Sequence, residues 1–311
     1  MAPIMRSSTW QTLLEAFMAR MGRRFVIGVP MVFLLLIFAL PFAVVFKISV
    51  SEVDGVRFVE LVTWQDGLLQ LKLKFTNYRT IFFEDDLYLR AYLSSIWFAG
   101  LTTVICLAIG YPFAYFLARS RAEIRPGLLM LLMLPFWTSF LLRVYAWKML
   151  LADNGVFNNI AIGLGLLAEP VKMMNTPFSL TLGMVYTYLP FMVLPLYANL
   201  VKLDIRLLEA ARDLGASPWQ AFWRITVPLS RGGIIAGALL VFIPCVGEFV
   251  IPELLGGPET LMIGRVLWDE FFSNNDWPMA SSVAVIMVLL IIVPLALFNK
   301  YQAETTTGAR R

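Results

Sequence analysis

Two glutamates lie inside an otherwise apolar stretch, and their placement is the clearest hint of chemistry in this chain. Glu248 and Glu253 both belong to the segment GEFVIPE. A carboxylate at membrane depth is costly unless it is paired or faces water. We therefore expect Glu248 to lie on a path for a cation; the alternative is a structural hydrogen bond to a neighbouring helix or a partner subunit. For Glu253, which lies nearer the outer end of the stretch, the alternative is solvation at the membrane interface.

Aromatic residues cluster near the expected outer ends of two neighbouring apolar segments. They are Trp137, Tyr145, Trp147, Tyr186 and Tyr188. Interfacial belts of Trp and Tyr explain any single one of them, but acidic groups beside aromatic faces also suit an organic cation. The predicted substrate path comprises Glu248, Glu253, Asp269, Glu270, Trp137, Tyr145 and Tyr186. Within it, we expect Asp269 and Glu270 to recruit substrate at the outer mouth or to contact a partner protein.

The side chains that most enzymatic sites need are missing. The chain has no histidine, which removes the commonest metal ligand and general base. Cys106 and Cys245 both lie in apolar segments, where packing explains them better than a disulfide or a metal pair. An intramembrane enzyme is therefore disfavoured. We expect no catalytic residue, no metal and no cofactor bound by this chain.

Composition predicts that these residues are held by membrane-spanning helices. The 311 residues are 59% apolar and 15% charged, with a mean hydropathy of +0.75, and one spanning helix needs about 20 apolar residues. Six stretches are long enough: 25–50, 91–118, 127–150, 178–201, 232–255 and 280–299. The predicted class is an all-α membrane protein with a six-helix domain over 25–300. A segment at 1–24 and a tail at 301–311 flank this domain.

Basic residues lie mostly on one side of the expected spans, which assigns that side to the cytoplasm. They are Arg6, Arg20, Arg23, Arg24, Arg119, Arg121, Arg125, Lys202, Arg206, Arg212, Arg224, Arg231, Lys300, Arg310 and Arg311. Both termini and a polar loop at 202–231 should therefore be cytoplasmic. The outer loop at 51–90 is richer in acids, and its alternating pattern favours partial strand or surface-helix structure. The net charge of +4 follows from this topology without a nucleic-acid surface.

The polar loop reads as two short helices joined by a glycine. Ile205, Leu208 and Ala211 or Leu214 share one face of a helix over 205–214. Gly215 then permits a positive backbone angle that ends this helix. Ser217, Pro218 and Gln220 have the types and spacing of a capping box that starts the second helix. The adjacent small residues Ala210 and Ala211 are expected to leave a flat spot for the close approach of another protein.

The same loop carries a family pattern. Glu209, Ala210, Ala211, Gly215, Ile225 and Pro228 match Glu-Ala-Ala, three residues, Gly, nine residues, Ile, one residue, Leu-Pro, with Val227 in place of Leu. This pattern resembles the cytoplasmic coupling loop of bacterial ABC-importer permeases; the alternative is an ordinary amphipathic interfacial helix. The resemblance implies the type I importer permease fold in the bacterial inner membrane. It further implies a second homologous permease, two copies of an ATPase that binds ATP and Mg, and a periplasmic binding protein.

A second resemblance concerns the substrate. GEFVIPELLGG and the following TLMIGRVLWDEFFSNNDWPMASS resemble the polyamine branch of these permeases, and within it the permease subunit of putrescine transporters. Putrescine is therefore the expected substrate, with spermidine, iron, thiamine or sulfate as alternatives because the coupling loop is common to permeases for all of them. An ion-coupled secondary transporter is a further alternative. It would have no use for the loop pattern, and it would often show two related halves, which are not evident here.

Overall fold

The computed structural model describes residues 25–308 except 52, 55–56, 59–61, 66–67 and 72. It describes no side chains in 52–72, 297–299 and 301–308, and the predicted segment at 1–24 lies outside the described residues. The chain divides into two units, residues 1–75 and 76–311. Each unit is described below by itself.

The first unit contains one long apolar helix, Phe25–Ser49, followed by two short antiparallel hairpins. The loop at 51–90, for which the sequence left partial strand and surface helix open, contains both kinds of structure among its described residues. The elements of this unit are η1 (Leu35–Ala39), α2 (Leu40–Ser49), β1 (Val53–Asp54), β2 (Arg57–Phe58), β3 (Val62–Gln65) and β4 (Leu68–Leu71).

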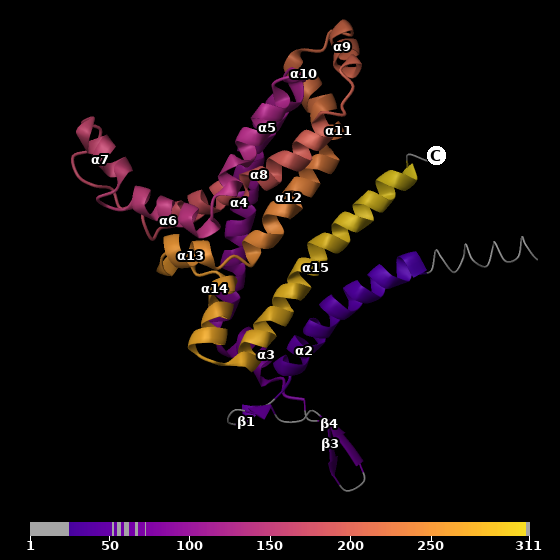
Figure 1. Ribbon diagram of the computed structural model, residues 1–311, viewed down its shortest axis with the longest axis vertical. Coiled ribbons are helices and arrows are strands. Elements are labelled where there is room, and N and C mark those ends of the chain that lie inside the picture. The colour runs from indigo at the N-terminus through magenta and orange to yellow at the C-terminus, as the bar shows by residue number, and fades with distance from the viewer. Residues whose placement is uncertain are drawn as a thin grey trace, which may run out of the picture. The chain divides into compact units, whose positions relative to one another are not determined.

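In the described residues of the second unit, all the regular elements are helices (Figure 1). Its first part contains α3 (Thr76–Arg79), η2 (Thr80–Glu84), α4 (Asp86–Arg119), α5 (Arg125–Met133), η3 (Leu134–Trp137), α6 (Phe140–Leu151), α7 (Val156–Gly163) and α8 (Pro177–Leu200). Its second part contains α9 (Arg206–Asp213), α10 (Pro218–Ala221), η4 (Phe222–Thr226), α11 (Val227–Leu229), α12 (Arg231–Val246), α13 (Val250–Leu255), η5 (Pro258–Thr260), α14 (Ile263–Trp268), η6 (Asp269–Ser273) and α15 (Trp277–Gly308).

Local capping sets where the long helices begin. Asp85 accepts a hydrogen bond from the backbone N–H of Leu87 at 2.8 Å, so α4 starts before the predicted residue 91. Thr176 and Ser179 form a reciprocal capping box at the start of α8, with Pro177 at the first helical position. Both helices therefore have an N-terminus encoded by adjacent residues.

Within the part of the chain that the structure describes, length and composition identify four helices that could cross a membrane: Phe25–Ser49, Asp86–Arg119, Pro177–Leu200 and Trp277–Ala296. Two bent pairs bring the number to six if each pair counts as one span. The first pair, Arg125–Trp137 with Phe140–Gly163, is bent by 85°, so the predicted span at 127–150 is not one straight helix. The predicted span at 232–255 is interrupted at 247–249, because α12 ends at Val246 and α13 begins at Val250.

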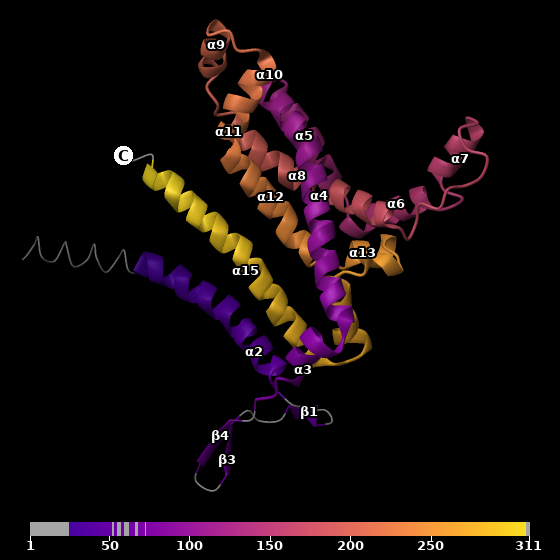
Figure 2. The same cartoon turned by 180° about the vertical axis from the view of Figure 1, so that it is seen from behind.

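The core of the second unit lies between α4, α8 and α12, which run side by side in Figures 1 and 2. Gly237 lets α12 approach α8 closely, since a Cβ atom there would lie 2.8 Å from Met192 Sδ and 3.1 Å from its carbonyl oxygen. Gly233, four residues earlier, would meet Asn199 Cβ at 2.8 Å. Small residues at this spacing are typical of tightly packed membrane helices. The three helices therefore form a closely packed support for the loops at their ends.

Candidate functional site

The polar loop between α8 and α12 contains a glycine turn whose hydrogen bonds define a Schellman motif. Gly215 has a φ of +83°, and its N–H donates to the carbonyl of Arg212 at 2.9 Å. The next N–H, of Ala216, reaches back to the carbonyl of Ala211, also at 2.9 Å. These two bonds end α9 as the sequence predicted. The predicted capping box of α10 is also confirmed, because Ser217 and Gln220 each accept the other's backbone N–H.

The two short helices share a small apolar core of their own. Leu208, Ala211 and Ala221 are buried in it, and Leu203, Ala216 and Ile225 pack around them. Ala211 therefore faces inward, and the expectation that both alanines form an outer flat spot is wrong for this residue. Ala210 and Glu209 are exposed. The family pattern thus combines residues that build the loop with residues that another protein can touch.

An aromatic contact joins this loop to the helical core. The ring of Phe222 lies edge-on to Tyr111 of α4, with ring centroids 5.5 Å apart, and also edge-on to Tyr115 at 6.0 Å. The hydroxyls of Tyr111 and Ser230 are 2.8 Å apart. Past Pro228, the chain bends by 65° between Leu229 and Arg231. A displacement of the loop would therefore act directly on α4 and α12.

Glu248 occupies the break between α12 and α13. Its Oε2 accepts a hydrogen bond from the Tyr188 hydroxyl on α8. Its Oε1 accepts the backbone N–H groups of Val250 at 3.1 Å and Ile251 at 3.4 Å. The carboxylate thus caps the first turn of α13 and links it to α8. Both the functional and the structural expectation for Glu248 remain compatible with this geometry.

A row of rings connects this break with the other interrupted span. Tyr188 lies 6.2 Å from Phe191 between ring centroids, and Phe191 lies 5.4 Å from Phe136. Phe136 belongs to η3, immediately before the 85° bend. Since Tyr188 and Phe191 are one turn apart on α8, both breaks face the same part of this helix.

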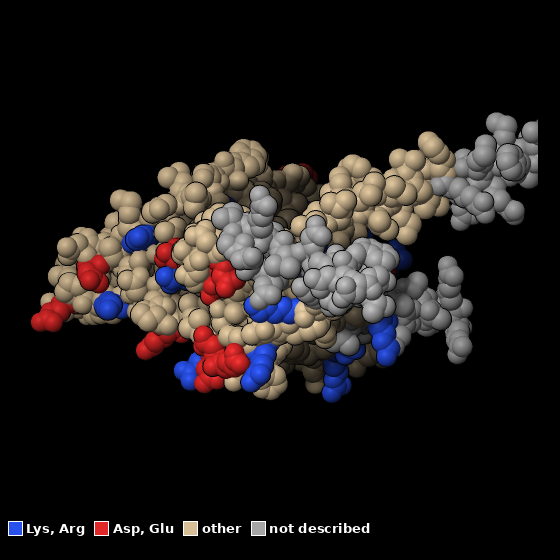
Figure 3. Space-filling view, turned by 90° about the horizontal axis from the view of Figure 1, so that it is seen from below, with Lys and Arg blue, Asp and Glu red and all other residues tan. Residues whose placement is uncertain are grey.

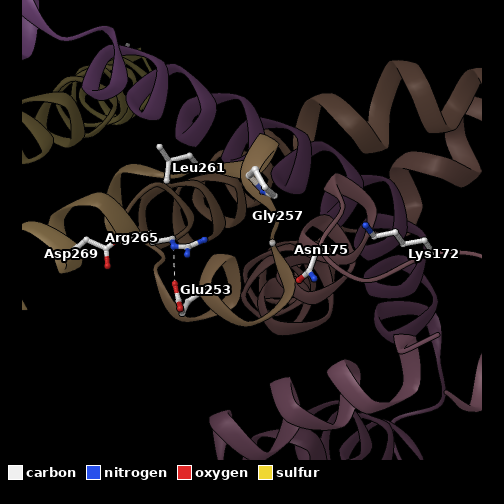
Figure 4. A pocket seen from close by; sticks show the side chains of 9 residues that line it. Lys172, Asn175, Glu253, Gly257, Leu261, Arg265 and Asp269 are labelled. Atoms are coloured by element: carbon white, nitrogen blue, oxygen red, sulfur yellow. Dashed lines mark ion pairs between the residues drawn. The ribbon is translucent and has the colours of Figure 1, made fainter. Parts of the chain in front are cut away.

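Glu253 and Asp269 line a separate cavity of about 600 Å³. Glu253 forms an ion pair with Arg265, with 2.7 Å between Oε2 and Nε. In Figure 4, Arg265 lies close to Glu253 and Asp269, while Lys172 lies on the other side of Gly257 with its nitrogen directed toward Asn175. The charges of these four side chains balance formally. The cavity is therefore a less favourable place for a cation than its two acids alone suggest.

The remaining predicted path residues are dispersed. Glu270 is buried rather than placed at an open mouth, and it accepts hydrogen bonds from Tyr88 at 2.7 Å and Asn274 at 3.0 Å. Tyr186 contacts Trp147 edge-on at 5.3 Å. Trp137 and Tyr145 are exposed. Across the described residues, no group of three His, Cys, Asp or Glu side chains could hold a metal ion.

Residue types alone did not indicate three members of this neighbourhood: Phe136, Phe191 and Arg143, whose guanidinium carbon lies 4.9 Å from the Phe136 ring centroid. Helical spacing could have indicated part of this cluster from the sequence. Residues 188 and 191 are three apart and share a face, whereas residue 186 lies on another face. The contact between Phe136 and α8 depends on a bend that the sequence pattern did not indicate.

Residues 110–306 match the family described as the binding-protein-dependent transport system inner membrane component. The spermidine/putrescine transport system permease protein PotB of Haemophilus influenzae is 43% identical over 73% of this chain and 78% of its own length. PotB of Escherichia coli K12 is also 43% identical, over 77% of this chain and 86% of its own. A bacterial ABC transporter structure involved in alginate import shares the fold, with a TM-score of 0.68, 17% identity, and coverage of 94% and 98%. The chain belongs to the inner membrane component family of binding-protein-dependent transport systems, and it is a non-catalytic permease subunit of an ABC importer.

Proposed function

We propose that this permease imports a polyamine, with putrescine as the expected substrate and spermidine as the alternative. The observation that carries the proposal is the 43% identity to PotB proteins over about three quarters of the chain. Their names include both polyamines, so the choice of putrescine rests on the resemblance of the segment around Glu248. The acid and the rings at the helix breaks give independent chemical support, because they suit an organic cation.

The coupling loop, residues 202–231, is proposed to face the cytoplasm and to dock on the ATPase. At the end of the second unit where this loop lies, Arg119 is the last residue of α4 and Arg125 is the first residue of α5. The loop itself adds three exposed arginines: Arg206, Arg212 and Arg224. At the opposite end, Glu84 and Asp86 pair with Arg79 and Arg90, and Figure 3 shows acidic side chains beside basic ones on that face. This difference follows the positive-inside rule. Both chain termini would then also be cytoplasmic.

Three kinds of partner complete the transporter in this proposal. A second homologous permease would form the other side of the path within the bilayer. An ATPase dimer would bind ATP and Mg and move the coupling loop, with Glu209 and Ala210 as contacts and Gly215, Ile225 and Pro228 holding the loop in shape. A periplasmic binding protein would deliver the substrate, which agrees with the family's description as binding-protein-dependent.

Glu248 is the proposed contact for a substrate ammonium group. A carboxylate has about four acceptor positions, and Tyr188, Val250 and Ile251 use three of them. One position therefore remains for a cation, while Tyr188, Phe191 and Phe136 offer ring faces to the methylene chain. Interrupted helices commonly build transporter substrate sites in this way. Glu253, Asp269, Glu270, Trp137, Tyr145 and Tyr186 lie outside this cluster and are not needed for the proposal.

Uptake of labelled putrescine and spermidine tests the proposal, with all partner subunits co-expressed. Glu248→Gln retains acceptors for the N–H groups of Val250 and Ile251 but removes the charge. A charge-assisted hydrogen bond contributes about 1.5–3 kcal/mol, so we expect KM to rise about 10- to 100-fold. Glu253→Gln is the matched control and should change KM little. Should Glu248→Gln transport normally while Glu248→Ala fails, Glu248 is a helix cap and the path lies elsewhere.

Two further outcomes separate the parts of the proposal. If the wild-type assembly hydrolyses ATP but takes up neither polyamine, the permease assignment stands and the substrate is wrong. If Glu209→Ala leaves uptake and ATPase binding unchanged, the proposed role of the loop's outer face is wrong. Measuring ATP hydrolysis beside uptake distinguishes these two cases.

A further inference from the structure

Arg143 is a cation whose surroundings within the described residues do not satisfy it. Its Nε and Nη1 are closed to solvent and have no hydrogen-bond partner among those residues. The contact given for its guanidinium is the ring of Phe136, with 4.9 Å between Cζ and the ring centroid. A ring face attracts the cation but does not replace acceptors for its N–H donors. Buried donors without acceptors are rare in complete assemblies.

Two other arginines with buried nitrogens have partners that Arg143 lacks, while the buried Nη2 of Arg119 also has no hydrogen-bond partner among the described residues. Arg265 pairs with Glu253 at 2.7 Å. Arg125 donates from Nη2 to the carbonyls of Ala118 at 3.1 Å and Ser120 at 2.8 Å. Among the described arginines, Arg143 is the one with two unpartnered buried nitrogens. Its position therefore calls for acceptors from outside this chain's described residues.

The helix that carries Arg143 offers an apolar surface for such a partner. Leu141, Leu142, Tyr145 and Met149 of α6 are all exposed, from 49% to 74%. Figures 1 and 2 agree that α6 and α7 extend away from the α4–α8–α12 core. α6 is also the second arm of a bent candidate span. An apolar face around a buried cation fits a membrane-embedded protein better than a water-soluble one.

We infer that the second permease covers α6 and supplies an Asp or Glu carboxylate that pairs with Arg143. This inference depends on the proposed function only in requiring a second permease; it does not depend on the substrate. The carboxylate would accept a charge-assisted hydrogen bond from Nε or Nη1, the two nitrogens that have no acceptor among the described residues. Arg143 would then set the register between the two permeases at the bend of the interrupted span.

Assembly of this chain with the second permease tests the inference directly. The tagged chain is co-expressed with the second permease and the ATPase, and the ratio of second permease to tagged chain is measured after purification. We expect Arg143→Gln to lower this ratio about tenfold or more, because the partner carboxylate is left buried and unpaired. Lys148→Gln is the matched control, since Lys148 is an exposed cation on the same helix, and it should leave the ratio unchanged. Arg143→Met keeps a long side chain over Phe136, and its yield by itself shows whether the chain still folds.

A search for the partner group completes the test. Each Asp and Glu in the spanning segments of the second permease is neutralised in turn, in the Arg143→Gln background. One such change should restore the wild-type ratio and should lower the ratio when Arg143 is intact. A wild-type ratio for Arg143→Gln, or the absence of any rescuing position, overturns the inference. Recovery on adding phosphatidylglycerol instead would also overturn it, by assigning the guanidinium to a lipid headgroup. The assembly ratio does not depend on the substrate. Failed polyamine uptake by a wild-type transporter that assembles normally would therefore refute the proposed substrate and leave the pairing of Arg143 to be decided by the ratio.

Discussion

Substitutions at Gly215 test whether backbone conformation or side-chain size determines the stability of the turn, because the two predict different rankings of Ala and Asn. The residue has a φ of +83°, and a Cβ atom built there would meet no atom within 4 Å. Crowding therefore contributes nothing, and the cost of a substitution comes from the backbone alone. An ordinary L-residue pays roughly 1–2 kcal/mol in the left-handed region, Asn adopts that region more readily than Ala, and a β-branched residue is a clear outlier there. Backbone conformation therefore predicts that destabilisation of the turn increases in the order Gly, Asn, Ala, Val. Side-chain size would predict that Ala destabilises the turn less than Asn.

The expected consequence is a shift in the local equilibrium of the loop. A cost of about 2 kcal/mol opposes the folded turn by roughly 30-fold, at about 1.4 kcal/mol for each factor of ten. The Gly215–Arg212 and Ala216–Ala211 hydrogen bonds, both 2.9 Å, would open first. Hydrogen exchange over residues 206–221 in the purified transporter measures this opening, and substrate uptake measures its effect on coupling. We expect faster exchange and slower uptake from Asn to Ala to Val.

The reasoning is refuted if Gly215→Ala exchanges more slowly than Gly215→Asn, since size rather than backbone angle would then govern the turn. It is also refuted if Gly215→Val has wild-type exchange and uptake. Leu214→Ala serves as a control, because it leaves Gly215 untouched and Leu214 is exposed beside it.

Two further substitutions have matched controls in the chain. Gly237→Ala should lower the stability of the transporter by about 1–3 kcal/mol through overpacking, because its Cβ would lie 2.8 Å from Met192 Sδ. Gly232→Ala is the control and should not lower it, since its Cβ would be 3.5 Å from a flexible amide. Equal melting temperatures for the two variants would contradict the close contact between α12 and α8. Ala211→Asp should unfold the loop, because Ala211 is buried in the apolar core of the loop. Faster hydrogen exchange over the loop would measure this unfolding. Ala210→Asp should leave exchange unchanged and reduce copurification of the ATPase; the reverse pattern would show that the two alanines have been assigned the wrong way round.

The coupling loop was largely predictable because its structure is set by neighbouring residues. Gly215 requires the left-handed turn, and Ser217 with Gln220 forms the cap three residues apart, so both features are encoded within a few positions. The inward direction of Ala211 was not predicted. It depends on Ala221 packing against Leu208 across the turn, and the pattern of one helix does not show what the next helix covers.

The spans were predictable in composition but not in course. Six apolar stretches follow from hydropathy, since any backbone in lipid must satisfy its hydrogen bonds internally. Hydropathy averaged over a long window does not reveal a break as short as that at 247–249, because the apolar residues of α12 and α13 on either side dominate the average. The break is held by Glu248, whose two carboxylate oxygens accept from Tyr188 and from the N–H groups that begin α13. A residue that stood out by its charge thus also determines where the helix ends.

The residues of the predicted substrate path do not form one cluster in the structure, because charge and aromaticity were grouped along the sequence instead of across helices. Glu253 is neutralised by Arg265, twelve residues later and on another helix. Glu270 is hydrogen-bonded to Tyr88, 182 residues earlier. Neither pairing leaves a periodic signal. Glu248 combines a spare acceptor position with neighbouring aromatic rings at a helix break, so the proposed cation path narrows to the point where both interrupted spans face α8.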